Sequence, residues 1–261
     1  MPELPDLTIY AENLGKAVIG KKIDRVEYYR RGRLDATSEE LTESLLKTEI
    51  AEVRRAGKQI HFEAKNGVVL RVHLMLTGGF ALTTAGELDR LDSPILAICF
   101  TDGSAVAVTD PKGWATLALN PKVGAEVPDA LDLDGDHLQR LIAKKPKALI
   151  KSLLLDQSLI GGIGNAYADE ILWRARISPK SAAGKLPPEA VIALAEAIPA
   201  VLKDAVEQLR KRHPDMVAGE YREFLKVHSP TLKVSPTGAM IIKENISSKR
   251  TYYTEEQKLY K

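Results

Sequence analysis

The stretch LLLDQSLIGGIGNAYADE, residues 153–170, contains two segments of helical pattern joined by a turn with three glycines. Glycine lets a backbone approach an anion closely, and the first amide groups of the following helix form an anion site. Asn165 can cap that helix and donate a hydrogen bond to a phosphate. No strand precedes the turn, so the pattern does not support a dinucleotide-binding fold. Taken alone, it is more typical of a tight connection between two helices than of a binding site.

Around this stretch the chain divides into a strand-rich half and a helix-rich half. Apolar spacing predicts helices over residues 5–15, 136–144, 146–156, 165–175 and 188–211. Between Lys22 and Leu119, short runs of two-residue alternation are separated by turn signals, which is typical of a β-sandwich or barrel. The last 30 or so residues return to a strand pattern and predict a hairpin.

These shifts predict an α+β protein of two domains. An N-terminal helix plus a β-sandwich occupies residues 1–123, and the stretch 124–136, which bears Pro and Gly, is the predicted linker. A helical domain follows over residues 137–225, and a terminal β-hairpin covers 226–261.

The composition is that of a soluble globular protein, with 44% hydrophobic and 28% charged residues in 261. No apolar run approaches the ~18 residues of a membrane span, and the polar N-terminus is no signal peptide, so we expect a cytoplasmic protein. Cys99 is the only cysteine, which excludes an internal disulfide and a cysteine-rich metal site. Basic residues are in excess in the C-terminal half. Such an excess fits a domain that holds a phosphate backbone, although solvated helix faces also carry it.

The first six residues, MPELPD, carry a second signal. If Met1 is removed, Pro2 presents a secondary amine at the chain terminus, and an α-amino group has a pKa of roughly 8, low enough to be nucleophilic near neutral pH. An amine that attacks a sugar carbon gives a Schiff base, and the Glu3 carboxyl is placed for proton transfer. The alternative is that Pro5 merely starts a helix whose dipole favours Glu3 and Asp6.

Together, the start Pro2-Glu3-Leu4-Pro5 and the segment 156–170 resemble the formamidopyrimidine-DNA glycosylase/endonuclease VIII family over essentially the whole chain. The resemblance implies an N-terminal helix plus β-sandwich, then a helical domain with a helix–two-turn–helix segment and a β-hairpin finger, with DNA between them. It implies a monomer that acts on damaged double-stranded DNA without a cofactor.

The resemblance also assigns roles to residues of the N-terminal half. Pro2 becomes the nucleophile that attacks C1′ of the damaged nucleoside, and Glu3 the acid and base. Lys58 maps to the family's hairpin lysine, a phosphate and acid–base contact, and His73 to its phosphate-binding histidine. The alternative for Lys58 is a solvated hairpin lysine, and for His73 a residue that fills the core or the surface.

A flipped base leaves a gap in the stack, which apolar wedges fill. Leu76 stands at the family's methionine wedge position, and Trp114 replaces its phenylalanine. Lys112 replaces the arginine that pairs with the widowed base. Because lysine lacks arginine's planar fork, we expect looser selectivity for the opposite base. In the helical domain, Lys151 and Asn165 are predicted DNA contacts.

The chain departs from the family pattern at three places. Asp6 replaces a glutamate and is assigned a supporting role. The four zinc-ligand positions of the finger fall, with their spacing intact, on Val234, Thr237, Thr254 and Gln257. None of these side chains is a thiolate or imidazole, so we expect no metal and a zincless finger. Its phosphate-gripping arginine maps to Lys249, with Arg250 beside it. The segment between Met216 and Lys233 is short, which favours oxidised pyrimidines or ring-opened purines as substrates.

Three functions remain in competition. The first is a bifunctional DNA glycosylase that removes an oxidised base through a Pro2 Schiff base and then cleaves the strand by β,δ-elimination. The second is a damaged-DNA-binding protein of weak or absent catalytic activity, which the substitutions at Asp6, Lys112 and the finger motivate. The third is a non-catalytic RNA or ribosomal protein, which would not need the N-terminal hexapeptide.

Overall fold

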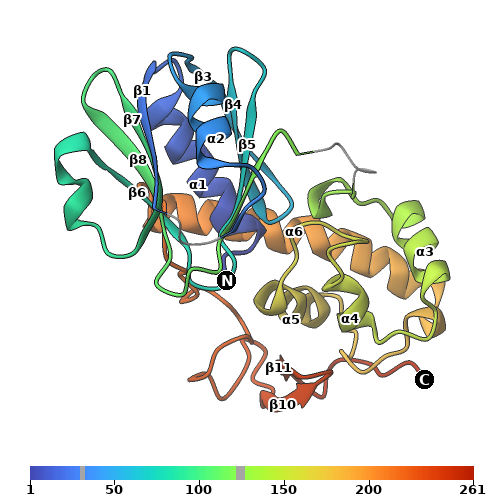
Figure 1. Cartoon of the computed structure of the whole chain (residues 1–261). Coiled ribbons are helices and arrows are strands. Elements are labelled where there is room, and N and C mark those ends of the chain that lie inside the picture. Colours follow the sequence, from blue (N-terminus) through green and yellow to red (C-terminus); the bar gives the residue numbers. More distant parts are fainter. Residues whose placement is uncertain (30–32, 122–126) are drawn as a thin grey trace. The chain divides into compact units, whose positions relative to one another are not determined.

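A computed structural model describes residues 1–29, 33–121 and 127–261 of the chain (Figure 1). The chain forms two compact units. Unit 1 comprises residues 1–125 and 209–220, and unit 2 comprises residues 126–208 and 221–261. Part of the predicted linker, residues 124–126, lies outside the described residues. The predicted α+β class with two domains is confirmed.

Unit 1 is built on two sheets, ordered β1-β7-β8-β6 and β2-β9-β5-β4-β3. Strand pairing is antiparallel except between the short β2 and β9. The strands are β1 (Ile23–Tyr28), β2 (Arg33–Leu34), β3 (Ile50–Ala56), β4 (Gln59–Ala64), β5 (Val69–His73), β6 (Gly79–Thr84), β7 (Pro94–Phe100), β8 (Ser104–Thr109) and β9 (Thr116–Leu119). A 3₁₀ helix, η1 (Ala85–Arg90), follows β6.

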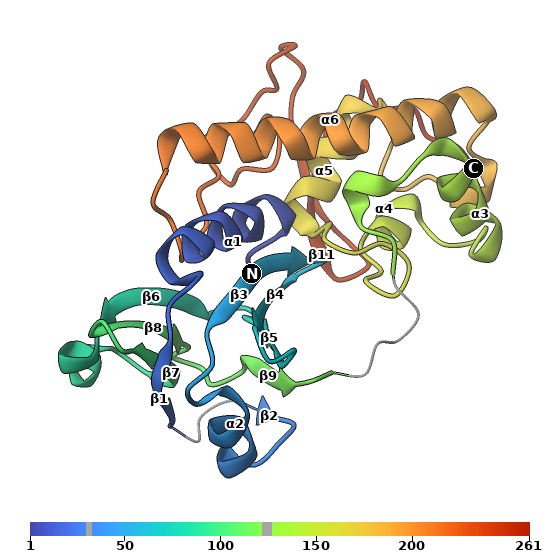
Figure 2. The ribbon, with the colours of Figure 1, turned by 90° about the horizontal axis from the view of Figure 1, so that it is seen from above.

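The predicted N-terminal helix is α1 (Leu4–Val18), which lies against β3 and β4 (Figure 2). Aromatic rings connect it to both sheets. Phe80 of β6 packs edge-on against Phe62 of β4, with 5.9 Å between ring centroids, and against Tyr10 of α1 at 6.5 Å. Such edge-to-face pairs add to the burial of the rings themselves. The start of the chain is therefore anchored in the core of unit 1.

One prediction for this half was wrong, because residues 38–45 form a helix, α2 (Ser38–Leu45), within the stretch that we expected to be strands. Thr37 is its N-cap: the Glu40 N–H donates to Thr37 Oγ1 at 3.1 Å, and the Thr37 N–H donates to Glu40 Oε2 at 2.8 Å. This capping box favours helix over strand, and Leu41 and Leu45, one turn apart, are fully buried.

Unit 2 is mainly helical. Its α-helices are α3 (Gly135–Lys144), α4 (Ile150–Leu154), α5 (Asn165–Arg174) and most of α6 (Pro188–Arg212), with 3₁₀ helices η2 (Ala130–Asp132) and η3 (Ala183–Lys185). Helix α4 is shorter than the predicted 146–156, because the backbone at Leu149 bridges to Ala182 and Ile150 N–H donates to the Ser181 carbonyl. Helix α6 continues through Pro199, as predicted.

The chain ends in the predicted hairpin, which consists of β10 (Ile242–Ile246) and β11 (Lys249–Tyr253). Strand β11 contacts α5 within unit 2. Of the helices within the described ranges, none combines the length and the apolar character that crossing a membrane requires.

Candidate active site

Three of the predicted site residues lie together at the start of α1. Pro2 is buried directly before the helix, and Glu3 is its N-cap, with only 5% of its surface exposed. Asp6, in the first turn, is fully buried, and its carboxylate accepts the Glu3 N–H at 2.9 Å. This bond satisfies an amide that a helix start otherwise leaves unpaired. Asp6 thereby fixes the backbone that carries Pro2 and Glu3.

A segment from far along the sequence lies beside the chain terminus within unit 1. The Met1 ammonium forms an ion pair with Glu220. Tyr10 and Asn13 of α1 both donate to backbone carbonyls of residues 214–219, with Asn13 bonds of 2.7 and 3.0 Å. The short segment that follows α6 is thus held on α1 next to the predicted nucleophile.

Lys58 lies in the tight turn between β3 and β4, where Gly57 adopts φ = 55°. Lys58 is buried, with 8% of its surface exposed. Arg55 holds the turn in place, since its guanidinium donates to the Gly57 carbonyl and to the Thr8 hydroxyl of α1, both at 3.1 Å. The hairpin that carries Lys58 is therefore tied to the helix that carries Pro2 and Glu3.

His73 ends β5, and its Nδ1 accepts the Met75 N–H at 3.2 Å. Burial lowers the pKa of His73, and the positive charges of Lys58 and Arg71 lower it further. The ring is consequently neutral at pH 7, with Nδ1 occupied as an acceptor. Its Nε2–H remains a donor of the kind that a phosphate oxygen accepts.

Two loops present the predicted wedge residues, and one buried carboxylate, that of Asp110, organises both. Leu76 and Trp114 are about half exposed, at 52% and 48%, and Lys112 is exposed, whereas Asp110 is 1% exposed. The donors to Asp110 are the Thr77 hydroxyl and the backbone N–H groups of Lys112, Trp114 and Ala115. Although burial opposes it, these four bonds lower the pKa of Asp110. Sequence reasoning assigned no role to Asp110.

In unit 2 the glycine-bearing turn is held by Gln157, which was not predicted as a site residue. Its side-chain amide donates to the Leu155 and Ile163 carbonyls, at 3.0 and 2.8 Å, and accepts the Gly162 N–H at 3.1 Å. Gly162 has φ = 106°, a conformation that favours glycine. The proposed cap was wrong: Gly164 is the N-cap of α5, and Asn165 is its first helical residue.

The structure gives the two predicted DNA contacts of this segment different surroundings. Asn165 is partly exposed, and its Nδ2 donates to the Arg250 carbonyl of β11 at 2.8 Å. Lys151 is 1% exposed, and its Nζ lies 2.7 Å from Asp169 Oδ1 of α5. An ammonium in this position does not reach a phosphate without breaking a buried ion pair. This placement argues against direct DNA contact by Lys151.

The finger presents Lys249 and Arg250 as exposed residues at the start of β11. Its apolar cluster consists of Val227, Ile241 and Tyr252, packed with Trp173. Val234, one of the four predicted zinc-ligand positions, lies outside this cluster: it is 47% exposed, and its strand-like bridge to Met240 lies at the surface.

Polar contacts connect the positions where the family has zinc ligands. The Thr254 N–H donates to the Gln257 side chain at 2.8 Å, and Gln257 in turn donates to the Ile177 carbonyl at 2.8 Å. The hydroxyls of Thr237 and Thr254 both donate to Glu256, at 2.7 and 3.2 Å. Within the described part of the chain, no three His, Cys, Asp or Glu side chains come together as a metal-binding group.

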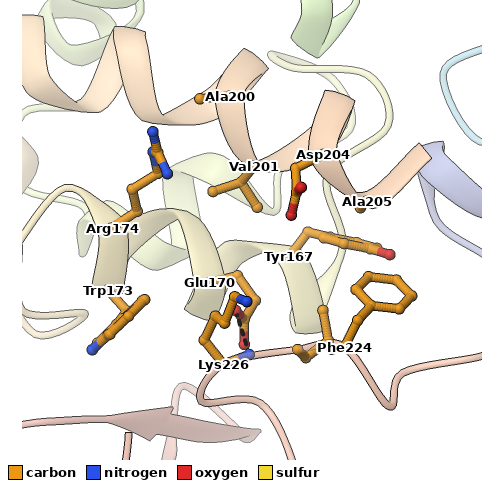
Figure 3. Close-up of a pocket in the computed structure, with 11 residues that line it drawn as sticks. Tyr167, Glu170, Trp173, Arg174, Ala200, Val201, Asp204, Ala205, Phe224 and Lys226 are labelled. Carbon is orange, nitrogen blue, oxygen red and sulfur yellow. Dashed lines mark hydrogen bonds between the residues drawn. The ribbon is translucent and has the colours of Figure 1, made fainter. Parts of the chain in front are cut away.

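Glu170 of α5 holds the base of the finger (Figure 3). Its carboxylate accepts the backbone N–H groups of residues 226, 227 and 228 at 2.8–2.9 Å. Burial nevertheless raises the pKa of Glu170. The adjoining cavity, between α5 and α6, has a volume of about 70 Å³. This volume lies well below the ~300–1,000 Å³ of typical small-molecule pockets.

Comparison with known proteins agrees with this architecture. The family model described as the formamidopyrimidine-DNA glycosylase N-terminal domain matches residues 1–117, and that of the H2TH domain of the same glycosylase matches 124–213. The formamidopyrimidine-DNA glycosylase of a Roseiflexus species is 32% identical and aligns over 98% of this chain and 99% of its own. That of Herpetosiphon aurantiacus is 34% identical over 79% of each chain.

A solved structure has the same fold. It contains a variant of the Lactococcus lactis glycosylase with DNA that bears Fapy-dG, and it superimposes with a TM-score of 0.84 at 25% identity, covering 97% of this chain and 98% of the other. An N-terminal β-sandwich followed by a helical H2TH domain is the architecture of a class of DNA glycosylases of base-excision repair. Within this class, the chain belongs to the formamidopyrimidine-DNA glycosylase family.

Proposed function

We propose that this protein is a bifunctional DNA glycosylase and AP lyase that uses Pro2 as its nucleophile. The observation that carries the proposal is the position of Pro2 and Glu3 at the start of α1, where Asp6 fixes the backbone and the Glu3 carboxyl is 5% exposed. While Met1 is attached, the Pro2 nitrogen is an amide and not nucleophilic, so the active form lacks Met1.

In the first step, the lone pair of the Pro2 nitrogen forms a bond to C1′ as the bond between C1′ and the base breaks, and the base leaves with the proton that the Pro2 nitrogen gives up. Glu3 donates a proton to the sugar ring oxygen, the ring opens, and a Schiff base links Pro2 to the deoxyribose. Loss of a C2′ proton to the Glu3 carboxylate then expels the 3′ phosphate. A second elimination expels the 5′ phosphate, and hydrolysis of the Schiff base frees Pro2.

Lys58, His73, Asn165, Lys249 and Arg250 supply phosphate contacts in this proposal. In addition to its phosphate contact, Lys58 takes part in proton transfer. Leu76 and Trp114 fill the space that the flipped base leaves, and Lys112 faces the widowed base. The enzyme acts as a monomer on damaged double-stranded DNA.

Oxidised pyrimidines and formamidopyrimidines are the proposed substrates. The segment after α6 is short, and residues 214–219 are bonded to α1. Little chain is thus left to close over the intact rings of 8-oxoguanine. Duplexes with thymine glycol, a formamidopyrimidine or 8-oxoguanine, assayed side by side, test this preference, and a faster excision of 8-oxoguanine would contradict it.

Borohydride trapping on duplexes with an abasic site tests the mechanism. The processed protein should form a covalent adduct, whereas a tag that keeps Met1 in place should abolish trapping with DNA binding nearly intact. Undiminished trapping by the tagged protein would refute the role of Pro2. Binding without any trapping by the processed protein would instead support a damaged-DNA-binding protein without catalysis.

A further inference from the structure

The helix–two-turn–helix unit holds a buried charged cluster that the proposed mechanism does not use. Lys151 of α4 and Asp169 of α5 form an ion pair of 2.7 Å, and both are 1% exposed. Asp169 Oδ2 lies 2.7 Å from His228 Nδ1 and accepts the Tyr252 N–H at 3.0 Å. The cluster therefore joins α4, α5, the base of the finger and β11.

The same lysine is bonded to Arg250 and Thr251, at the start of the strand that presents the side chains of Lys249 and Arg250. Lys151 Nζ donates to Thr251 Oγ1 at 2.7 Å and lies 3.5 Å from the Arg250 carbonyl. The Thr251 hydroxyl, fully buried, donates in turn to the Lys249 carbonyl at 2.9 Å. Asn165 donates to the Arg250 carbonyl as well. The backbone of Lys249 and Arg250 is thus fixed from inside unit 2.

A buried ion pair rarely adds net stability, because removing both charges from water costs about as much as their attraction returns. Such a pair can instead specify geometry. Here its bonds lead to residues 249–252 of β11, where two adjacent cations, Lys249 and Arg250, are exposed.

We propose that Lys151 and Asp169 are positioning residues that fix the backbone of Lys249 and Arg250 so that these two side chains contact the DNA backbone. They do for this finger what a bound metal would do elsewhere: they fix the strand that carries the phosphate contacts. The proposal rests on the proposed function, since it requires that Lys249 and Arg250 bind DNA. In this role Lys151 does not contact DNA itself.

The test combines variants of the buried cluster with a variant that lacks the Lys249 and Arg250 side chains. Lys151→Met/Asp169→Asn removes both charges together, which avoids an uncompensated buried charge. Thr251→Val leaves the ion pair intact and deletes only the hydroxyl between Lys151 and the Lys249 carbonyl. Each change is made in the wild-type protein and in Lys249→Ala/Arg250→Ala. Lys145→Met is the matched control, because it breaks an ion pair of the same unit, with Asp156, away from the hairpin.

The measurements are the dissociation constant for an abasic-site duplex, its salt slope, and KM and kcat of excision. For the cluster variant we expect a roughly tenfold higher Kd and KM and a shallower salt slope, with kcat within about twofold, since a lost bond to a charged group is worth about a factor of ten or more. Thr251→Val should act in the same direction. In the Lys249→Ala/Arg250→Ala background neither change should weaken binding further.

Equal losses of DNA affinity in both backgrounds would overturn the proposal, because they would show that the cluster acts on stability and not through Lys249 and Arg250. An unchanged Kd in Thr251→Val and in the cluster variant would overturn it as well. If the cluster variant does not fold, Thr251→Val alone decides. The proposed function fails separately, by absence of trapping in the wild type, and the binding measurements still report on the cluster in that case.

Discussion

Replacing Asp110 with Asn should disturb both wedge loops at once. In the native structure each carboxylate oxygen accepts two hydrogen bonds, Oδ1 from Thr77 and the Lys112 N–H, and Oδ2 from the N–H groups of Trp114 and Ala115. Asparagine keeps one acceptor oxygen for the Trp114 and Ala115 N–H groups, and its NH₂ group can donate to the Thr77 hydroxyl, which also accepts. The Lys112 N–H then faces that NH₂ group and loses its acceptor, and the other three bonds are made to a neutral group at a position that is 1% exposed.

A lost hydrogen bond to a charged acceptor costs about 1.5 kcal/mol or more, and the three remaining bonds weaken because their partner is now neutral, so the stability of unit 1 should fall by roughly 3 kcal/mol in all. At about 3–4 °C per kcal/mol for a unit of this size, the melting temperature should fall by roughly 10 °C. Excision should fall more than this stability loss explains, because Leu76, Lys112 and Trp114 are no longer held in one arrangement.

Two measurements separate these effects. Thermal unfolding gives the stability loss, and single-turnover excision at saturating enzyme, about 20 °C below the melting temperature of the variant, gives the loss of activity in the folded protein. Asp24→Asn, at an exposed position of β1, is the control and should match the wild type. A variant at Asp110 that melts within about 2 °C of the wild type and excises at the same rate would refute the reasoning.

Three further outcomes are expected. Glu3→Gln should lose base excision by ~10²–10⁴-fold, the contribution of a positioned acid, but should still cleave pre-formed abasic sites; wild-type excision rates would contradict its role. Purified protein should contain no stoichiometric zinc, and chelators should leave its melting temperature unchanged, whereas one zinc per chain would overturn the zincless finger. Burial lowers the pKa of His61 from 6.5 to about 4, with two neighbouring arginines adding to it. The unfolded chain takes up this proton first, so stability should fall as the pH drops from 6.5 towards 4. His61→Phe should flatten that dependence in acid denaturation, and an unchanged pH profile would contradict it.

Local patterns were enough to predict the elements whose signals are local. The helical patterns of residues 188–211 and 165–175 placed α6 and α5 to within one residue at each end, although the N-cap of α5 is Gly164 and not Asn165. Helix α2 was missed although Thr37 and Glu40 form a capping-box pair, because the alternating strand pattern of the flanking residues was assumed to continue through residues 38–45.

The surroundings of Lys151 could not be predicted, because they depend on contacts between distant parts of the chain. Helix α4 has only five residues, too few for a periodicity that separates buried from exposed positions. Its lysine is paired with residues 18 and 100 positions further along. A lysine in a basic, DNA-binding segment was therefore assigned to the surface, where most lysines lie.

The finger also bears on how the protein fares under oxidants. Thiolates that hold zinc are converted by peroxide to sulfenic and higher acids, and the metal is then released. In this finger hydroxyl, amide and carboxylate groups at Thr237, Thr254, Glu256 and Gln257 take that place, and peroxide does not oxidise them. The single thiol, Cys99, is 1% exposed in β7, and burial raises its pKa. The DNA contact proposed for this finger therefore does not depend on groups that peroxide oxidises.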